Sequence, residues 1–152
     1  MAVNLASQFW QAPDQVAQAL LLDSGLLCHL MRIASPHDLY HHAMRGPGIE
    51  TWVVIETLKH RFKRGLTADL YLWCDTHGQE VDRVFQQGQQ VQAVECKSGV
   101  AYSADWMGPA RRWCKAVGPA AKPPVVVNGG ASSHARSDHR VLSWQDPGLA
   151  SA

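Results

Sequence analysis

The sequence predicts an α/β domain with a central mixed β-sheet flanked by helices. Apolar residues between Ile49 and Arg64 recur at helical spacing, and Gly65 follows them as a natural helix stop. From residue 69 the pattern changes to an alternation with a period of two, which is typical of β-strands. Further along the chain, a run of valines after Pro123-Pro124 indicates one more strand, buried on both faces.

The elements are expected in the order helix, three strands, helix, strand. Short polar links join the three strands, so we expect them to form an antiparallel meander. The first helix should pack on the sheet that these strands build. The expected helices are 48–64 and 105–117, and the expected strands are 69–74, 79–85, 91–97 and 124–128, with 140–144 as a short last strand.

The chain divides into three parts by composition. Residues 1–45 are expected to form an N-terminal helical segment, with one helix opening at Pro13 and a second at Leu26. A Gly-Pro-Gly sequence separates this segment from the α/β domain, residues 46–146. Residues 147–152 are rich in small residues, and we expect a frayed tail.

The apolar stretch 14–34 is too short to form stable helices by itself. We expect it to pack on the sheet domain, or to cover a surface left by a missing part of a longer protein. In the second case an exposed apolar patch would drive self-association.

Charge and targeting signals exclude several classes of protein. The 152 residues carry 14 basic and 13 acidic side chains, a formal net charge of +1, which excludes a strongly basic nucleic-acid binder. No signal peptide and no clean membrane-spanning stretch is visible, so a cytoplasmic protein is expected. Two local basic groups could contact phosphates, although such residues more often form the solvated side of a helix: Arg61, Lys63 and Arg64, and Arg111, Arg112 and Lys115.

The chemistry-bearing residues concentrate on two of the expected strands. Glu95 and Lys97 are two residues apart, so both point to one face of their strand, and Glu80 and Asp82 do the same on the strand before. If the register aligns, Asp82 and Glu95 can share a divalent cation such as Mg²⁺, which prefers oxygen ligands. Lys97 could then orient or help to deprotonate an attacking water. The alternative is a solvated strand face that carries Glu and Lys.

The order of these residues along the chain resembles that of the PD-(D/E)XK nuclease superfamily. A helix with Glu50 and Glu56 precedes the strand with Asp82, and the E-x-K strand follows. The resemblance implies a restriction-endonuclease-like fold, with Glu50, Asp82, Glu95 and Lys97 as catalytic residues. It places a metal, expected to be Mg²⁺, on Asp82, Glu95 and Glu50, with Glu56 and Glu80 as secondary candidates.

Whole segments resemble an uncharacterised domain found at the C-terminus of many prokaryotic AAA+-type ATPases. The similarity covers about residues 20–146, and that family is itself similar to PD-(D/E)XK nucleases. The chain departs from the family pattern at three positions: Cys74 replaces an Arg, Arg83 replaces an apolar residue after Asp82, and Ile49 replaces an aromatic residue. The segments that carry the resemblance are 22–26, 46–59, 70–75, 78–82, 94–99, 127–130 and 141–144.

Two functions are compatible with the sequence. The first is a nuclease-like domain that performs Mg²⁺-dependent phosphodiester hydrolysis or DNA processing, normally appended to an ATPase. The second is a non-catalytic docking or DNA-binding module of an ATPase, in which the acidic residues would form salt bridges with neighbours such as Arg83 or Lys97. No G-x-x-x-x-G-K-[ST] phosphate loop occurs, so this chain has no ATP site of its own. The chain would then be a separate copy of the domain, a remnant of a longer gene, or a fragment of a longer chain.

Overall fold

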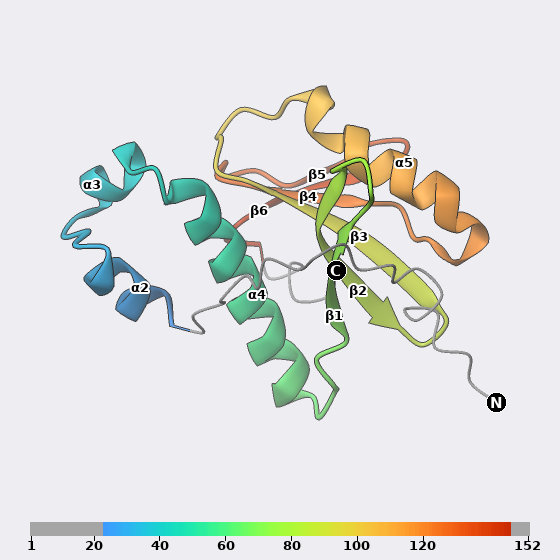
Figure 1. The fold of residues 1–152 in the computed structure, drawn as a ribbon, viewed down its shortest axis with the longest axis horizontal. Helices are drawn as coiled ribbons and strands as arrows, with labels where there is room; N and C mark the ends of the chain where they lie inside the picture. The colour runs from blue at the N-terminus through green and yellow to red at the C-terminus, as the bar shows by residue number, and fades with distance from the viewer. Residues whose placement is uncertain (1–22, 147–152) are drawn as a thin grey trace.

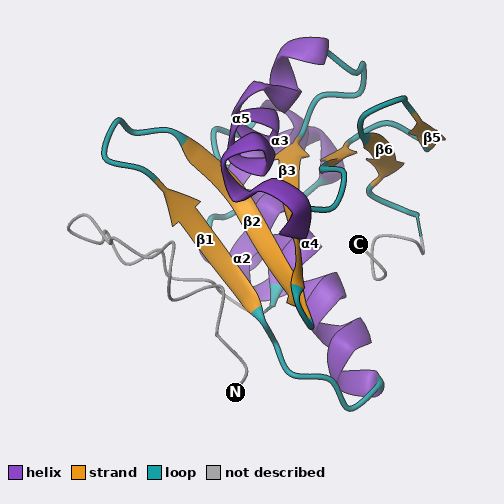
Figure 2. Cartoon of the chain, turned by 90° about the vertical axis from the view of Figure 1, so that its right-hand side faces the viewer, coloured by secondary structure: helices purple, strands orange, loops and turns teal. Residues whose placement is uncertain are grey.

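The computed structural model describes residues 23–146, and it has the mixed α/β architecture that the sequence predicts. The helix expected from Pro13 and the frayed tail at 147–152 lie outside the described residues. Figure 1 shows the fold, and Figure 2 shows it turned by 90°. Its elements are α2 (Ser24–Leu30), α3 (Pro36–His41), α4 (Arg45–Lys63), β1 (Leu70–Cys74), β2 (Glu80–Gln87), β3 (Gln90–Lys97), α5 (Gly108–Val117), β4 (Val125–Asn128), β5 (His134–Ala135) and β6 (Arg140–Ser143), with short 3-10 turns η1 (Ala104–Met107) and η2 (Gly118–Ala120).

The six strands form one mixed sheet in the order β1-β2-β3-β4-β6-β5. The first three strands are the expected antiparallel meander, whereas β4 runs parallel to β3 and β6 parallel to β4. The connection between β2 and β3 is tighter than expected, because both strands continue to a two-residue turn in which Gly88 has a φ of +62°. The added edge strand β5 is antiparallel to β6 and was not predicted, because it has only two residues and both are exposed.

Helices cover both faces of the sheet, α4 on one and α5 on the other (Figures 1 and 2). On the α4 face, Val53 packs with side chains of β2, β3, β4 and β6, among them Phe85 and Val94. On the α5 face, Ala110 and Trp113 pack with side chains such as Ala93. Neighbouring residues of β3 therefore face different helices, as the alternation of a strand buried on both faces requires.

Helix α4 begins before the Gly-Pro-Gly sequence that was expected to precede it. The helix starts at Arg45 and includes Gly46, Pro47 and Gly48 in its first turn. Proline is compatible with this position because the N–H groups of a first helical turn have no intrahelical partner. The helix expected over 48–64 therefore begins three residues earlier than predicted.

Two short helices precede α4 and contact it (Figure 1). Helix α2 was expected, whereas α3 was not among the expected helices. The Ser35 hydroxyl accepts a hydrogen bond from the Asp38 N–H (3.2 Å) and donates one to the Asp38 carboxylate (2.8 Å), which caps the helix at its start. Helix α2 has no buried residue, and Leu30 is 60% exposed. Within residues 23–146, no helix has the length and apolar character needed to cross a membrane.

Candidate functional site

An irregularity in β2 sets the position of Asp82. Tyr71 of β1 pairs with Val84 and Trp73 pairs with Val81, so β2 has one residue more than β1 in this interval. The backbone pairing of β2 with β3 ends at Arg83. Bulges of this kind bend a strand and re-aim its side chains, and they are common beside functional sites.

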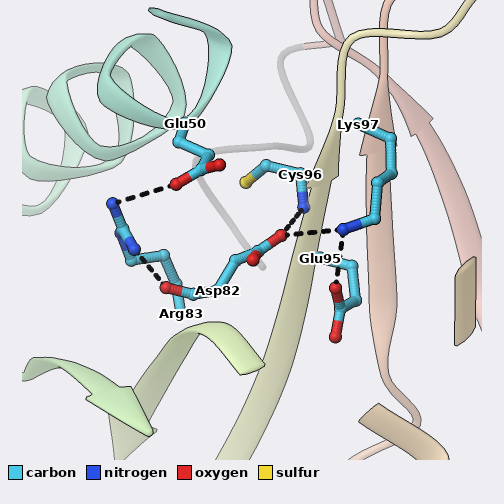
Figure 3. A network of polar contacts seen from close by, with 6 residues as sticks. All are labelled: Glu50, Asp82, Arg83, Glu95, Cys96 and Lys97. Carbon is cyan, nitrogen blue, oxygen red and sulfur yellow. Dashed lines mark hydrogen bonds and ion pairs between the residues drawn. The ribbon is translucent and has the colours of Figure 1, made fainter. Parts of the chain in front are cut away.

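Beyond the last backbone pair of β2 and β3, the Asp82 carboxylate forms the next contact between the two strands. Its Oδ2 accepts a hydrogen bond from the backbone N–H of Cys96, with a distance of 2.7 Å. The same oxygen lies 3.3 Å from the Nζ of Lys97, which lies 3.1 Å from Oε2 of Glu95 (Figure 3). The structure thus brings together the two carboxylates and the lysine that the sequence singled out on the second and third strands.

Lys97 is charged in this arrangement. Burial opposes its charged form, but the carboxylates of Asp82 and Glu95 together overcome this effect and raise its pKa above the ordinary value. The side chain is 32% exposed, so its ammonium group can exchange a carboxylate contact for solvent or for a bound molecule.

Glu95 is the most deeply buried carboxylate of the site, with a side chain only 2% exposed. Burial and, after it, the negative charge of Asp82 raise the pKa of Glu95 to about 7, against the opposing effect of Lys97. Its Oε2 accepts from Lys97, whereas its buried Oε1 has no hydrogen-bond partner within the described part of the chain. A buried oxygen without a partner is costly, and it marks the side of Glu95 on which a ligand is expected.

Glu50 reaches the same region from α4 but meets a different partner. Its Oε2 lies 3.9 Å from Nη2 of Arg83 (Figure 3). Another nitrogen of Arg83, Nη1, donates to the backbone carbonyl of Asp82. The guanidinium group therefore connects the Glu50 carboxylate with the backbone carbonyl of Asp82. The described residues contain no group of three or more acidic, histidine or cysteine side chains arranged around one metal position.

Arg83 also belongs to this cluster. The docking hypothesis named it, with Lys97, as an ion-pair partner of the acidic residues, but the sequence did not indicate that it would be buried beside Glu50. Its side chain is 2% exposed, and its Nε and Nη2 have no hydrogen-bond partner among residues 23–146. The neighbouring Cys96 is also buried, and burial raises the pKa of its thiol well above the ordinary value.

The two secondary candidates have other contacts. Glu56 forms an ion pair with Lys59 at 2.5 Å on the surface of α4. The Oε1 of Glu80 lies 3.8 Å from Sγ of Cys74 in the neighbouring strand. Neither residue contacts Asp82, Glu95 or Lys97 through a hydrogen bond or ion pair given by the structure.

Several of the basic residues proposed as phosphate contacts are engaged within the protein. Arg61 is buried and pairs with Asp69 at 3.0 Å, Arg111 pairs with Asp138 at 2.7 Å, and Arg112 donates to a glutamine side chain at 2.6 Å. Hydrogen bonds from Arg111 and His139 lower the pKa of the Asp138 carboxyl to about 2. These arginines stabilise the fold, which weakens their interpretation as a phosphate-binding surface.

Asp82 and Glu95 both supply carboxylate oxygens, the type of ligand that Mg²⁺ prefers. Among residues 23–146, Oε1 of Glu95 has no hydrogen-bond partner. The donor chemistry of these two residues is compatible with one divalent cation. Glu50, the third expected ligand, contacts Arg83 through one of its carboxylate oxygens.

Fold and site together define an α/β domain with a carboxylate–lysine cluster on two adjacent strands of its sheet. The model of a protein family, Domain of unknown function (DUF4143), matches residues 45–146, and the chain belongs to this family. The family often occurs together with AAA ATPases, in agreement with the resemblance seen in the sequence. No curated protein and no solved structure matches the chain.

Proposed function

We propose that this domain is a Mg²⁺-dependent nuclease of the PD-(D/E)XK type, which hydrolyses phosphodiester bonds. The observation that carries the proposal is the convergence of Asp82, Glu95 and Lys97 at the end of the β2–β3 pairing, with one buried oxygen of Glu95 left without a partner. The placement of the residues supports it too: Glu50 lies on the helix before the meander, Asp82 on its second strand, and Glu95 and Lys97 on its third.

Mg²⁺ held by Asp82 and Glu95 would supply Lewis-acid chemistry, stabilising charge on a phosphoryl oxygen and lowering the pKa of a bound water. The Cys96 N–H fixes the orientation of the Asp82 carboxylate. Because its pKa is raised, Lys97 remains protonated and acts as a hydrogen-bond donor rather than as a general base. Its ammonium group then orients the attacking water and stabilises negative charge that develops on the phosphate.

A second candidate is a non-catalytic docking module that acts with an AAA ATPase. The observation in its favour is that Asp82 and Glu95 are ion-paired with Lys97, and Glu50 with Arg83. Such pairs balance most of the charge of the cluster without any metal ion. In this case the cluster would stabilise the β2–β3 connection, and the partner would recognise another surface.

Metal titration followed by a cleavage assay distinguishes the two candidates. Wild type is titrated with Mn²⁺ and Mg²⁺ and then incubated with single-stranded and duplex DNA and RNA. Asp82→Asn tests the site, and Glu56→Gln is the matched control, because Glu56 is a glutamate of the same domain outside the cluster. The nuclease proposal expects metal binding and cleavage in wild type and Glu56→Gln, and neither in Asp82→Asn. Wild type that binds no divalent ion at millimolar concentration overturns it.

A further inference from the structure

The domain contains two buried arginines, and their surroundings differ. Arg61 donates to the carbonyls of Thr67 and Gln86 and to the Asp69 carboxylate, at 2.7, 3.3 and 3.0 Å. Arg83 is more deeply buried, yet among the described residues its Nε and Nη2 have no hydrogen-bond partner. Arg61 thus has three hydrogen-bond acceptors, whereas the contacts given for Arg83 are one hydrogen bond to the Asp82 carbonyl and the ion pair with Glu50.

Burial of a guanidinium group is costly unless an anion is close by, because arginine cannot give up its proton. For Arg83 that anion is Glu50, with the two side chains 3.9 Å apart. The side chain of Glu50 is 23% exposed, so most of it is covered by protein.

We propose that Arg83 is a built-in cation that keeps Glu50 as its counter-ion, so that the site binds a single divalent cation through Asp82 and Glu95 alone. The part of this inference that concerns the metal ion rests on the proposed function. Arg83 is a positioning residue in this assignment, because it acts through Glu50 and touches neither metal nor substrate.

Lys97 and Arg83 differ in their exposure to solvent, which supports different roles for the two cations. Lys97 is 32% exposed and carries its charge at the end of a flexible stem, so it can move away from Asp82 when a metal ion binds. Arg83 is enclosed, and Nη1 is held by the Asp82 carbonyl. A divalent ion can therefore compete for the Lys97 side of the cluster, while the Arg83 side already holds a fixed positive charge.

The experiment measures Mn²⁺ binding by the loss of the free-ion electron paramagnetic resonance signal, together with thermal unfolding of the same full-length variants. The variants are Glu50→Gln, Arg83→Met, their combination, and Arg83→Lys, which retains a charge if Arg83→Met fails to fold. Arg61→Met is the matched control, since Arg61 is also a buried arginine paired with a carboxylate. It lies at the far end of α4, about 16 Å along the helix from Glu50.

We expect wild type to bind one Mn²⁺ and Glu50→Gln to bind it with an affinity within about twofold of wild type. Arg83→Met, which removes this positive charge from Glu50, should bind Mn²⁺ at least fivefold more tightly or bind a second ion. Arg83→Lys should retain wild-type binding. Arg61→Met should lower the unfolding temperature without a change in Mn²⁺ affinity. The combined variant should be no less stable than Arg83→Met alone.

Glu50→Gln that weakens Mn²⁺ binding tenfold or more would overturn the inference, since Glu50 would then be a ligand. Unfolding temperatures of Glu50→Gln and Arg83→Met that add independently in the combined variant would also overturn it. Wild type that binds no Mn²⁺ refutes the proposed function and the one-ion site with it. The unfolding measurements then decide the counter-ion assignment by themselves.

Discussion

The carboxylate of Asp82 accepts a hydrogen bond from the backbone N–H of Cys96, at 2.7 Å, just beyond the last backbone pair of β2 and β3. A side chain thus takes the place of a backbone acceptor at a bulge. The same oxygen contacts Lys97, so the position of the lysine depends on the path of the β2 backbone. Asp82 therefore both joins the two strands and positions Lys97, and substitutions of Asp82 should separate these two roles.

Asp82→Asn should retain the fold, because the amide oxygen can still accept from the Cys96 N–H. Asp82→Ala should lower the free energy of unfolding by about 2 kcal/mol, since it leaves that buried N–H without an acceptor. Urea unfolding followed by fluorescence measures both values. Equal stability of the alanine and asparagine variants would show that the Cys96 hydrogen bond contributes nothing.

Gly130 should be irreplaceable for reasons of space. A Cβ at this position would lie 2.7 Å from the backbone carbonyl oxygen of Val100, so Gly130→Ala must displace the loop that follows Lys97. We expect a loss of about 2 kcal/mol of stability. Gly48 in α4 has nothing within 4 Å of such a Cβ apart from its chain neighbours and its own helix backbone, so Gly48→Ala should be neutral or stabilise by about 0.5 kcal/mol. Thermal unfolding of the two variants compares them directly.

The fold was predictable from the sequence where a pattern extends over several residues. The alternation in β1, β2 and β3 and the valines of β4 gave strands whose ends differ from the structure by no more than two residues. The misses are local. Helix α3 depends on a cap formed by one serine side chain, and a two-residue strand such as β5 has no period to detect.

The candidate site was predictable only in part. The spacing of Glu95 and Lys97 places both on one face of a strand whatever the tertiary structure is. The place of Arg83 depends instead on the bulge in β2 and on how α4 packs on the sheet, neither of which the residue pattern specifies. The residue pattern therefore predicted Glu50 as a third acidic residue of the site, but not its ion pair with the buried guanidinium group of Arg83, which also donates to the backbone carbonyl of Asp82.

The stability of the metal-free protein should depend on pH through Glu95. Its pKa is raised to about 7 in the folded protein, so the folded state binds this proton more tightly than the unfolded state does. The contribution is therefore fully present below the ordinary pKa of a glutamate and is lost as the pH rises through about 7. Asp138 has the opposite shift, but its pKa of about 2 places the effect below pH 4.

Glu95→Gln isolates this contribution, because glutamine imitates the protonated acid at every pH. In the presence of a chelator, wild type should lose stability relative to Glu95→Gln between pH 5 and pH 8, by on the order of 1–3 kcal/mol. Urea unfolding of both proteins at each pH gives the difference between their free energies of unfolding. The histidines titrate equally in both proteins, so their contribution cancels in this difference. A difference that is independent of pH would show that Glu95 is ionised throughout this range.

Lys97→Met should separate metal binding from catalysis. The substitution removes the ammonium group that contacts Asp82 and Glu95 but leaves both carboxylates in place. Mn²⁺ affinity should therefore be equal to that of wild type or higher, because a competing cation is gone. The rate of phosphodiester cleavage should fall about 100-fold, the usual effect of removing one group that stabilises charge in a transition state. Isothermal titration with Mn²⁺ and a single-turnover cleavage assay on the same preparation measure the two effects. A variant that loses metal binding together with activity would show that Lys97 maintains the structure of the cluster, and that the proposed role toward water and phosphate is incorrect.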